Sequence, residues 1–385
     1  MQLTATGPTL GVVGGGQLGR MLAEAASPLG VSLVVLDPTP ECPAYPVARE
    51  QIVGSFDDEE GIRALAERSD ALTFEIELAD PDVMERIAED AGVPVQPSPD
   101  TLRLIQDKLV QKRALADAGI AVPEFRAVGS PEELRVALSE LGTPAMVKAR
   151  RGGYDGRGNL PIEGPDDAGG VLADLGTDAM VEAFVPFVRE LSVIGVKGRD
   201  ELRTYVAGEN VHEEEILRET VVPARTSDEV RERAQGVARE VLSLMDGRGT
   251  YGIELFETEA GEILVNEIAP RPHNSGHWTI EGARTSQFEN HVRAVLGLPL
   301  GPTEVQKTTV SANLLGDAPS REARLSGVAD VLAEPNAHLH WYGKREVRDL
   351  RKMGHVTVTG EEGEDDRGTL LETARSCRER LEFEP

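Results

Sequence analysis

Short apolar runs alternate with amphipathic stretches over the first hundred residues of the chain. Residues 9–37 predict a strand, a glycine-rich turn, a helix and a second strand, in that order. Residues 59–69 predict another helix, and residues 73–77, Thr-Phe-Glu-Ile-Glu, predict the strand that follows it. Because strands and helices alternate, we expect a parallel-sheet α/β domain.

The glycine-rich turn carries the first candidate chemistry. Gly14 to Gly19, with Asp37 at the end of the second strand, imitates a dinucleotide-binding fingerprint. The N–H groups at a helix N-terminus favour an anion or a phosphate, and the segment alone supports nothing narrower. An NAD-dependent oxidoreductase is therefore one alternative. Glu75, near the end of its strand, is either a ligand contact or a surface acid.

Prolines at positions 94–99 mark a boundary, and one helix is predicted over residues 100–118. Lys108 is the residue of interest in this helix. Lys112, one turn further on, is interpreted as ordinary solvated surface.

The next unit places Lys148 inside an apolar strand, residues 145–149, where a lysine is costly unless an anion meets it. The glycine-rich loop that follows, residues 152–159, can present N–H groups to phosphate, although it lacks the Gly-Lys-Ser/Thr ending of a P-loop. A surface hairpin is the alternative. Tyr154 and Asp155 in this loop suit contact with a second substrate.

A predicted strand at residues 179–185 leads into an extended segment that suits an adenine edge. Glu190 suits ribose hydroxyls, although both features can equally be structural. His212 alone is interpreted as a surface or packing histidine. Residues 226–245 predict an amphipathic helix.

Two short apolar strands, residues 253–257 and 263–268, are predicted to form a hairpin with its turn at residues 260–261. Symmetric pairing places Glu254 opposite Glu267, with their Cβ atoms roughly 5 Å apart. Two opposed carboxylates repel unless a cation lies between them, and their oxygens suit Mg²⁺ or Mn²⁺. A solvated acidic face is the alternative.

Two further polar clusters follow the hairpin. The loop after it concentrates side chains beside this metal site, namely Arg271, His273, Asn274 and His277. The strongest basic cluster of the chain comes later and consists of Lys344, Arg348, Arg351 and Lys352. In an acidic chain such a cluster indicates a bound phosphate rather than a solvated face.

Composition narrows the function classes. At 385 residues the chain is too long for one ordinary core, so we expect two or three domains. We expect no membrane span and no signal peptide, and two distant cysteines fit the reducing cytoplasm. A net charge of −27 argues against a nucleic-acid partner. Acidic excess with few lysines is typical of proteins from salt-loving organisms.

Taken together, the motifs resemble the ATP-grasp superfamily, and within it the ligases that carboxylate 5-aminoimidazole ribonucleotide. The matching segments, in chain order, are G-G-G-Q-L-G-R-M at 14–21, T-F-E-I-E at 73–77, R-R-G-G-Y-D-G-R-G at 150–158, E-N-V-H at 209–212, N-E-I-A-P-R-P-H-N-S-G-H-W-T at 266–279, S-Q-F-E at 286–289, and Y-G-K-R-E-V-R with R-K-M-G-H within 342–355. Asp349–Leu350 departs from the pattern, which has Pro-Gly at that point.

The resemblance implies an α/β, overall α+β, ATP-grasp fold in three parts. These are an N-terminal parallel-sheet, Rossmann-like domain at 1–106, a small lid domain at 107–184, and a C-terminal mixed domain at 185–385 with a terminal subdomain at about 305–372. It also implies a homodimer in the cytoplasm.

The implied reaction is the ATP-dependent carboxylation of 5-aminoimidazole ribonucleotide with bicarbonate, through carboxyphosphate, in purine biosynthesis. Such phosphoryl transfer needs positioning and charge neutralisation rather than a covalent nucleophile.

The resemblance also assigns roles to residues. ATP would be bound by Lys108, Lys148, Gly153, Tyr154, Asp155, Gly156, Arg157, Gly158, Asn159, Glu182, Ala183, Phe184, Val185, Glu190, His212, Asn266 and Glu267. Mg²⁺ or Mn²⁺ would be held by Glu254 and Glu267. Bicarbonate and carboxyphosphate would meet the catalytic residues Arg271, His273 and Asn274. The ribonucleotide would be bound by Gln17, Glu75, Tyr154, Asp155, Lys344 and Arg351.

Two more alternatives remain beside the oxidoreductase. One is another ATP-grasp carboxylase or formyl-transferring ligase, which would share the lysines and carboxylates without the closing basic motif. The other is a nucleotide-binding regulatory protein that has lost catalysis, against which Glu254, Glu267, Arg271 and His273 argue.

Overall fold

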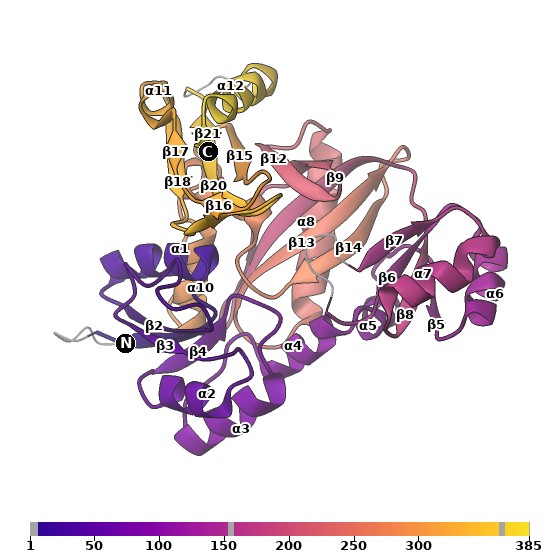
Figure 1. Cartoon of the computed structure of the whole chain (residues 1–385), viewed down its shortest axis with the longest axis horizontal. Helices are drawn as coiled ribbons and strands as arrows, with labels where there is room; N and C mark the ends of the chain where they lie inside the picture. Colours follow the sequence, from indigo (N-terminus) through magenta and orange to yellow (C-terminus); the bar gives the residue numbers. More distant parts are fainter. Residues whose placement is uncertain (1–6, 153–157, 362–365, 385) are drawn as a thin grey trace.

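Three main β-sheets organise the chain in this computed structural model, which describes residues 7–152, 158–361 and 366–384 (Figure 1). The first is an N-terminal sheet of order β3-β2-β1-β4 whose strand pairs are all parallel. The predicted parallel-sheet domain is thus confirmed. Its elements are β1 (Thr9–Val13), α1 (Gln17–Ala26), β2 (Ser32–Asp37), β3 (Glu50–Val53), α2 (Glu59–Ala66), β4 (Ala71–Phe74) and α3 (Pro81–Ala91).

Side chains alternate across this sheet and meet helices on both faces. Leu10 and Val12 of β1 pack with α1 and with α10 (Gln287–Val295), whereas Val13 packs with α2 and α3. The strand β4 is shorter than predicted. It ends at Phe74, so Glu75 lies in the loop that follows it.

The connection to the next sheet is broken where one helix was predicted. The structure has α4 (Pro99–Gln106) and α5 (Lys108–Asp117), so the single helix over residues 100–118 is wrong. Asp107 between them has an extended backbone, and its carboxylate accepts hydrogen bonds from the N–H groups of Leu109 and Val110. This cap starts a new helix.

A small antiparallel sheet of order β5-β8-β6-β7 forms one end of the molecule, at the right of Figure 1. Two helices, α6 and α7, pack their apolar residues against it. The elements are β5 (Phe125–Val128), α6 (Pro131–Leu141), β6 (Ala145–Ala149), β7 (Asn159–Ile162), η2 (Pro165–Asp167), α7 (Ala168–Leu175) and β8 (Ala179–Ala183).

The largest sheet has the order β14-β13-β9-β11-β12-β15-β20-β18, with β10 paired to β9. Its elements are β9 (Phe187–Lys197), β10 (Leu202–Thr204), β11 (Gly208–Glu213), β12 (Ile216–Val222), α8 (Asp228–Leu244), β13 (Gly249–Thr258), β14 (Ile263–Ala269), β15 (Thr309–Leu315), β18 (Ala337–Trp341), β20 (Lys352–Thr359) and α12 (Arg367–Glu379). Shorter elements are η1 (Ser27–Leu29), η3 (Asn274–Gly276), α9 (Thr279–Gly282), β16 (Arg321–Glu322), β17 (Leu325–Ser326), α11 (Val328–Leu332), β19 (Glu346–Val347) and β21 (Glu382–Phe383).

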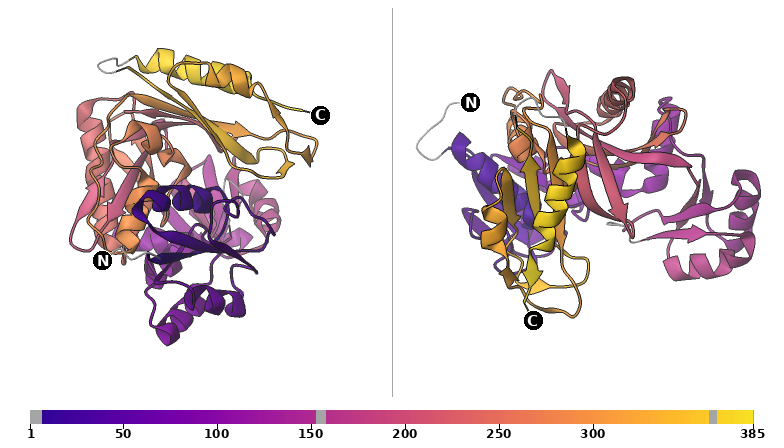
Figure 2. Two further views of the ribbon diagram at one scale, coloured as in Figure 1. Left: turned by 90° about the vertical axis from the view of Figure 1, so that its left-hand side faces the viewer. Right: turned by 90° about the horizontal axis from the view of Figure 1, so that it is seen from above.

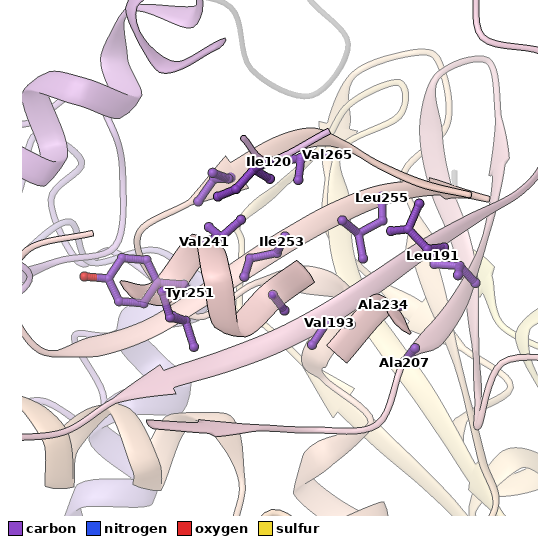
Figure 3. Close-up of a cluster of buried hydrophobic side chains, with 14 of the residues drawn as sticks. Ile120, Leu191, Val193, Ala207, Ala234, Val241, Tyr251, Ile253, Leu255 and Val265 are labelled. Carbon is purple, nitrogen blue, oxygen red and sulfur yellow. The ribbon is translucent and has the colours of Figure 1, made fainter. Parts of the chain in front are cut away.

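The helix α8 covers the β13–β14 end of this sheet. Figure 3 shows Val193, Ile253 and Leu255 of the strands facing Ala234 and Val241 of α8, and all of these side chains are buried. This core fixes the strands whose other face carries the polar residues of the candidate site.

The helix α12 lies along β15 and β20 at the other end of the sheet (Figure 2). Because β12 pairs with β15, backbone hydrogen bonds run from the central strands into the predicted terminal subdomain. The proposed division into 1–106, 107–184 and 185–385 stays a prediction. Among the described residues, no helix combines the length and the apolar character needed to cross a bilayer.

Candidate active site

The hairpin of β13 and β14 carries two glutamates opposite each other, as the pattern predicts. Glu254 pairs with Glu267 in antiparallel register. One step further along, the register shifts and Leu255 lies opposite Val265. The shift leaves Asn266 as the extra residue of a β-bulge, a feature that re-aims the side chains beside it.

Lysines from two other elements face this bulge. The Nζ atom of Lys108, the first residue of α5, lies 3.0 Å from Oε1 of Glu267. The Nζ atom of Lys148, in β6, donates to Oδ1 of Asn266 at 3.2 Å. The bulge therefore directs two consecutive polar side chains at two cations.

The two opposed glutamates differ in their electrostatic surroundings. Burial raises the pKa of Glu254 to about 7, while His212 opposes the shift and Glu267 adds to it. Burial acts in the same direction on Glu267, but Lys108 outweighs it and holds the pKa of Glu267 below its usual range, although 44% of its side chain is exposed. Two carboxylates in this arrangement favour a cation between them. Within the described ranges, no group of three or more histidine, cysteine or carboxylate side chains forms a metal cluster.

Lys112 is not a solvated residue, and that interpretation is wrong. Its side chain is 2% exposed and its Nζ atom lies 3.0 Å from Oε1 of Glu182. The same Nζ donates to the carbonyl oxygen of Val265 at 2.9 Å. The other carboxylate oxygen of Glu182 lies 2.6 Å from Nζ of Lys148. Lys112 lies on the buried side of α5 together with Leu109 and Leu115.

The segment predicted to meet adenine follows β8. Glu182 turns its buried side chain toward the lysines, and its backbone lies in register with Phe125 of β5 and Met146 of β6. Ala183 donates its N–H to the carbonyl of Glu124, and the side chain of Phe184 is exposed. The carbonyl of Val185 accepts from the N–H of Phe187. These contacts place the segment at the end of the small sheet.

Glu190 and His212, both predicted near the ribose, contact each other. Oε2 of Glu190 lies 3.1 Å from Nδ1 of His212. Burial lowers the pKa of this histidine, but the carboxylate outweighs it and the net shift is upward. The pairing indicates an ordered polar side chain rather than a freely solvated one.

The loop after β14 carries the predicted catalytic residues. Nε of Arg271 lies 2.9 Å from Oε1 of Glu77, and Nε2 of His273 lies 3.7 Å from Oε1 of Glu254. Nδ1 of His273 is 2.8 Å from the hydroxyl of Ser275. These contacts hold the loop against both the hairpin and the N-terminal sheet.

Two residues of this loop, Asn274 and His277, have buried side-chain atoms and, within the described residues, make no ion pair with the hairpin or with Glu77. Both side-chain amide atoms of Asn274 are buried and have no hydrogen-bond partner among the described residues. His277, which was grouped with the loop, is instead buried in packing contacts, and its ring stacks on His355 with 4.7 Å between centroids. Burial lowers the pKa of His277 well below its usual value.

Comparisons with known proteins match the chain along its length. Three family models match in order: the ribonucleotide synthetase preATP-grasp domain at 8–106, the ATP-grasp domain at 113–288, and the phosphoribosylaminoimidazole carboxylase C-terminal domain at 309–367. The N5-carboxyaminoimidazole ribonucleotide synthase of Brucella melitensis is 41% identical over 91% of this chain and 96% of its own length. That of Bacillus subtilis is 40% identical over 92% of each.

The chain belongs to the N5-carboxyaminoimidazole ribonucleotide synthase family. Solved structures agree with this assignment. The carboxyaminoimidazole ribonucleotide synthase of Aspergillus clavatus complexed with ATP has a TM-score of 0.89 and 36% identity, covering 97% of this chain and 99% of that one. The synthetase of Thermotoga maritima has a TM-score of 0.87 and 40% identity over the same shares.

Membership of the N5-carboxyaminoimidazole ribonucleotide synthase family removes the oxidoreductase alternative, and the glycine-rich turn shows why its pattern misleads. Gly16 and Gly19 donate their N–H groups to the two carboxylate oxygens of Glu75, the second at 2.5 Å. Gly15 donates to Oδ2 of Asp37 at 2.9 Å. The chain's own carboxylates thus occupy the donors that a nucleotide phosphate would need.

Glu75 is 8% exposed, so its reading as a surface acid is wrong. Burial raises the pKa of Glu75 to about 7, and the hydrogen bonds from Gly19 and Gly16 oppose that shift. A side chain on Gly14, whose φ is +106°, would overlap Cγ of Glu75 at 2.4 Å. The glycines therefore make room for this carboxylate. Gln17 follows directly as the first residue of α1.

The basic motif that is specific to this family lies between β18 and β20. Nζ of Lys344 donates to the carbonyl of Lys352 at 2.6 Å, and Arg351 donates to the carbonyl of Glu346 at 2.8 Å. Burial, reinforced by Arg348, lowers the pKa of Arg351. Leu350, where the family pattern has glycine, has φ +58°.

The glycine-rich loop of the small sheet is described only in part. Gly153, Tyr154, Asp155, Gly156 and Arg157 lie outside the described residues. Gly158 accepts a hydrogen bond from the N–H of Ala149 at 2.7 Å, and Asn159 pairs with Lys148 in the β6–β7 register.

Sequence reasoning missed three residues that structure this site. They are Lys112, Glu77 as the partner of Arg271, and Asp107, whose carboxylate lies 2.6 Å from the guanidinium of Arg150. Lys112 left one signal. Few lysines occur in the chain, and this one stands a helical turn from Lys108.

Proposed function

We propose that this chain carboxylates 5-aminoimidazole ribonucleotide with bicarbonate, using ATP, in purine biosynthesis. The products are N5-carboxyaminoimidazole ribonucleotide, ADP and phosphate. The observation that carries the proposal is the meeting of Lys108 and Lys148 with the bulged hairpin, in a chain of this family. A related structure, from Aspergillus clavatus, was solved with ADP and 5-aminoimidazole ribonucleotide.

In the first step a bicarbonate oxygen attacks the γ-phosphorus of ATP, ADP leaves, and carboxyphosphate forms. Its carbon, or the CO₂ released from it, then bonds to the amino nitrogen, while phosphate departs and the nitrogen loses a proton. Lys108 and Lys148 neutralise the phosphates in this scheme. Glu190 and His212 hold the ribose, and the segment from Glu182 to Val185 holds adenine through its backbone.

The hairpin fits a divalent cation. Glu254 and Glu267 offer opposed carboxylate oxygens, and Asn266 offers an amide oxygen beside them. Mg²⁺ or Mn²⁺ bound there would neutralise charge on the β- and γ-phosphates. Glu254 and Glu267 lie opposite each other, and a divalent cation between them would relieve the repulsion by which Glu267 adds to the raised pKa of the buried Glu254.

Bicarbonate is assigned to the loop after the hairpin. Arg271 supplies charge and His273 adjoins Glu254. The unpartnered amide of Asn274 offers a donor nitrogen to the oxygens of bicarbonate and an acceptor oxygen to its hydroxyl. A ligand hydrogen-bonded to that amide would remove the free-energy cost of burying the amide without a partner.

The ribonucleotide is assigned to the space between the N-terminal turn and the basic motif. Lys344 and Arg351 would bind its 5′-phosphate, and Tyr154 and Asp155 would close over it. Gln17 would contact it directly, whereas Glu75 would shape the turn that presents Gln17. A homodimer, a cytoplasmic location and adaptation to high salt complete the proposal.

The test is ADP release measured with the full chain in bicarbonate, Mg²⁺ and high salt, with and without 5-aminoimidazole ribonucleotide. We expect the ribonucleotide to stimulate ADP release and labelled bicarbonate to enter the product. ADP release that ignores the ribonucleotide would sink the substrate assignment. Omitting bicarbonate is the matched control.

A further inference from the structure

A buried cluster of three charged groups lies behind the nucleotide-facing lysine. Glu182 sits between Lys112 and Lys148, with one carboxylate oxygen 3.0 Å from the first and the other 2.6 Å from the second. The side chains of Glu182 and Lys112 are 3% and 2% exposed, while that of Lys148 is 10% exposed. The cluster therefore opens to the site only through Lys148.

Its members come from one helix and from two strands of the small sheet. Lys112 belongs to α5, which connects the N-terminal sheet to the small sheet, and Glu182 and Lys148 belong to strands β8 and β6 of the small sheet. Lys112 also donates to the carbonyl of Val265 in β14, directly before the bulged Asn266. One buried ammonium thus contacts both β8, through the carboxylate of Glu182 that also pairs with Lys148, and β14, the strand that carries Glu267.

The charge count decides what this arrangement does. Two ammonium groups and one carboxylate leave a net charge of +1. If Lys112 were absent, Lys148 would be the remaining cation paired with Glu182 among the described residues, and their charges would cancel. A phosphate approaching Lys148 would then meet a neutral pair and would have to compete with a buried carboxylate.

We propose that Lys112 is a positioning residue whose charge offsets that of Glu182, so that the charge of Lys148 is available to the phosphates of ATP. The proposal rests on the proposed function, because it takes Lys148 to be a phosphate contact. Lys112 itself does not touch the nucleotide. It acts through Glu182 and, by its bond to Val265, through the backbone beside the bulge.

The test compares ATP binding by four full-length proteins in Mg²⁺, measured by calorimetry: the wild type, Lys112→Met, Glu182→Gln, and the double variant. We expect Lys112→Met to weaken ATP binding by on the order of tenfold, a coupling typical of residues in one charge network. The double variant removes both the carboxylate that pairs with Lys148 and the ammonium that offsets it, so we expect its affinity to return to within about threefold of the wild type. Steady-state kinetics should show the same pattern in KM for ATP, with kcat little changed.

Two further variants separate positioning from folding. Lys112→Arg keeps the charge and should bind ATP nearly as well as the wild type. Lys197→Met, which removes an ammonium bonded to the carbonyls of Leu242 and Met245, should lower thermal stability without changing ATP affinity. If Lys112→Met does not fold, a double variant or a Lys112→Arg protein that binds ATP about tenfold more weakly than the wild type overturns the inference.

The outcomes are distinct. If the wild type binds no ATP, the proposed function is overturned, and this inference with it. If the wild type binds ATP, the inference alone is overturned by either of two results. One is that Lys112→Met binds ATP as well as the wild type, and the other is that the double variant binds no better than Lys112→Met.

Discussion

Two regions of this molecule gather charged groups around glycine-rich or bulged backbone, and they use those groups in opposite ways. In the N-terminal turn, Glu75 and Asp37 accept hydrogen bonds from the backbone N–H groups that a phosphate would otherwise meet. At the bulged hairpin, Glu254 and Glu267 face each other, and lysines approach from neighbouring elements. In the first region the chain's own carboxylates occupy the backbone N–H donors. In the second region the two carboxylates face each other and can bind a ligand.

Exposure shows the same difference. Glu75 is 8% exposed and both of its oxygens accept hydrogen bonds, whereas the side chain of Glu267 is 44% exposed and has Lys108 as its ion-pair partner. A carboxylate that is buried and fully bonded serves the fold. One that is exposed and opposed to another carboxylate is available to a ligand. A glycine-rich pattern therefore identifies a nucleotide site only when the donors it creates are left without partners inside the protein.

Glu267→Gln tests whether the carboxylates of the hairpin bind a metal ion, and it has the largest expected effect. We expect kcat to fall by on the order of 1,000-fold, because a bound metal contributes several kcal/mol to charge stabilisation in such reactions. Thermal stability should change little, since 44% of the side chain is exposed and glutamine has nearly the same shape. ADP release at saturating substrates is the measurement. Full activity would remove the metal role. Glu262→Gln, in the turn of the same hairpin, is the control and should stay active.

The sequence predicted the hairpin well because pairing there is local. The predicted pairing of Glu254 with Glu267 is confirmed, although one constant register does not produce it. Next to the turn Leu255 lies opposite Val265, and the bulge at Asn266 then brings Glu267 opposite Glu254. The bulge at Asn266 could not be predicted, since it depends on contacts with β6 and α5, which lie far away in the chain.

The environment of Lys112 was missed for a related reason. A continuous helix over residues 100–118 satisfied the pattern, but Asp107 interrupts it to cap α5 and to pair with Arg150. The new helix then turns Lys112 toward Glu182. The glycines of the N-terminal turn were likewise assigned to a phosphate, because the partner that fills their site, Glu75, comes more than fifty residues later.

Glu75→Gln tests the first half of the comparison. Glutamine has one acceptor oxygen where the carboxylate has two, so the N–H of Gly16 or of Gly19 loses its partner. We expect a loss of about 2 kcal/mol in the free energy of unfolding, the usual cost of one buried unpaired donor. Urea denaturation at pH 8 measures it, and KM for ATP should stay unchanged. The opposite pattern, unchanged stability with a raised KM for the ribonucleotide, would make Glu75 a direct substrate contact.

His291 of α10 connects the two regions by hydrogen bonds, and we expect low pH to weaken that connection and lower the stability of the fold. Its Nδ1 accepts the N–H of Thr250 in β13 at 3.1 Å, which leaves Nε2 as the protonated nitrogen, 2.8 Å from the hydroxyl of Thr73 in β4. Burial lowers the pKa of His291 to about 3 from 6.5. The folded state thus holds the ring neutral. The contribution of His291 to the free energy of unfolding is complete above pH 6.5 and is lost as pH falls below that value. In that range the histidine is protonated in the unfolded chain but not in the folded chain.

The expected loss from His291 is about 1.4 kcal/mol per pH unit below pH 6.5. Free energies of unfolding at pH 5, 6 and 7 and constant salt measure the slope. His291→Gln should lower stability at pH 7 but flatten the slope by one proton's worth, whereas His338→Gln, at an exposed position of β18, should leave the slope as it is. An unchanged slope in His291→Gln would mean that this ring is protonated in the folded state. The hydrogen bonds of a neutral His291 to Thr73 and Thr250 would then not be what holds the N-terminal sheet against the β13–β14 hairpin.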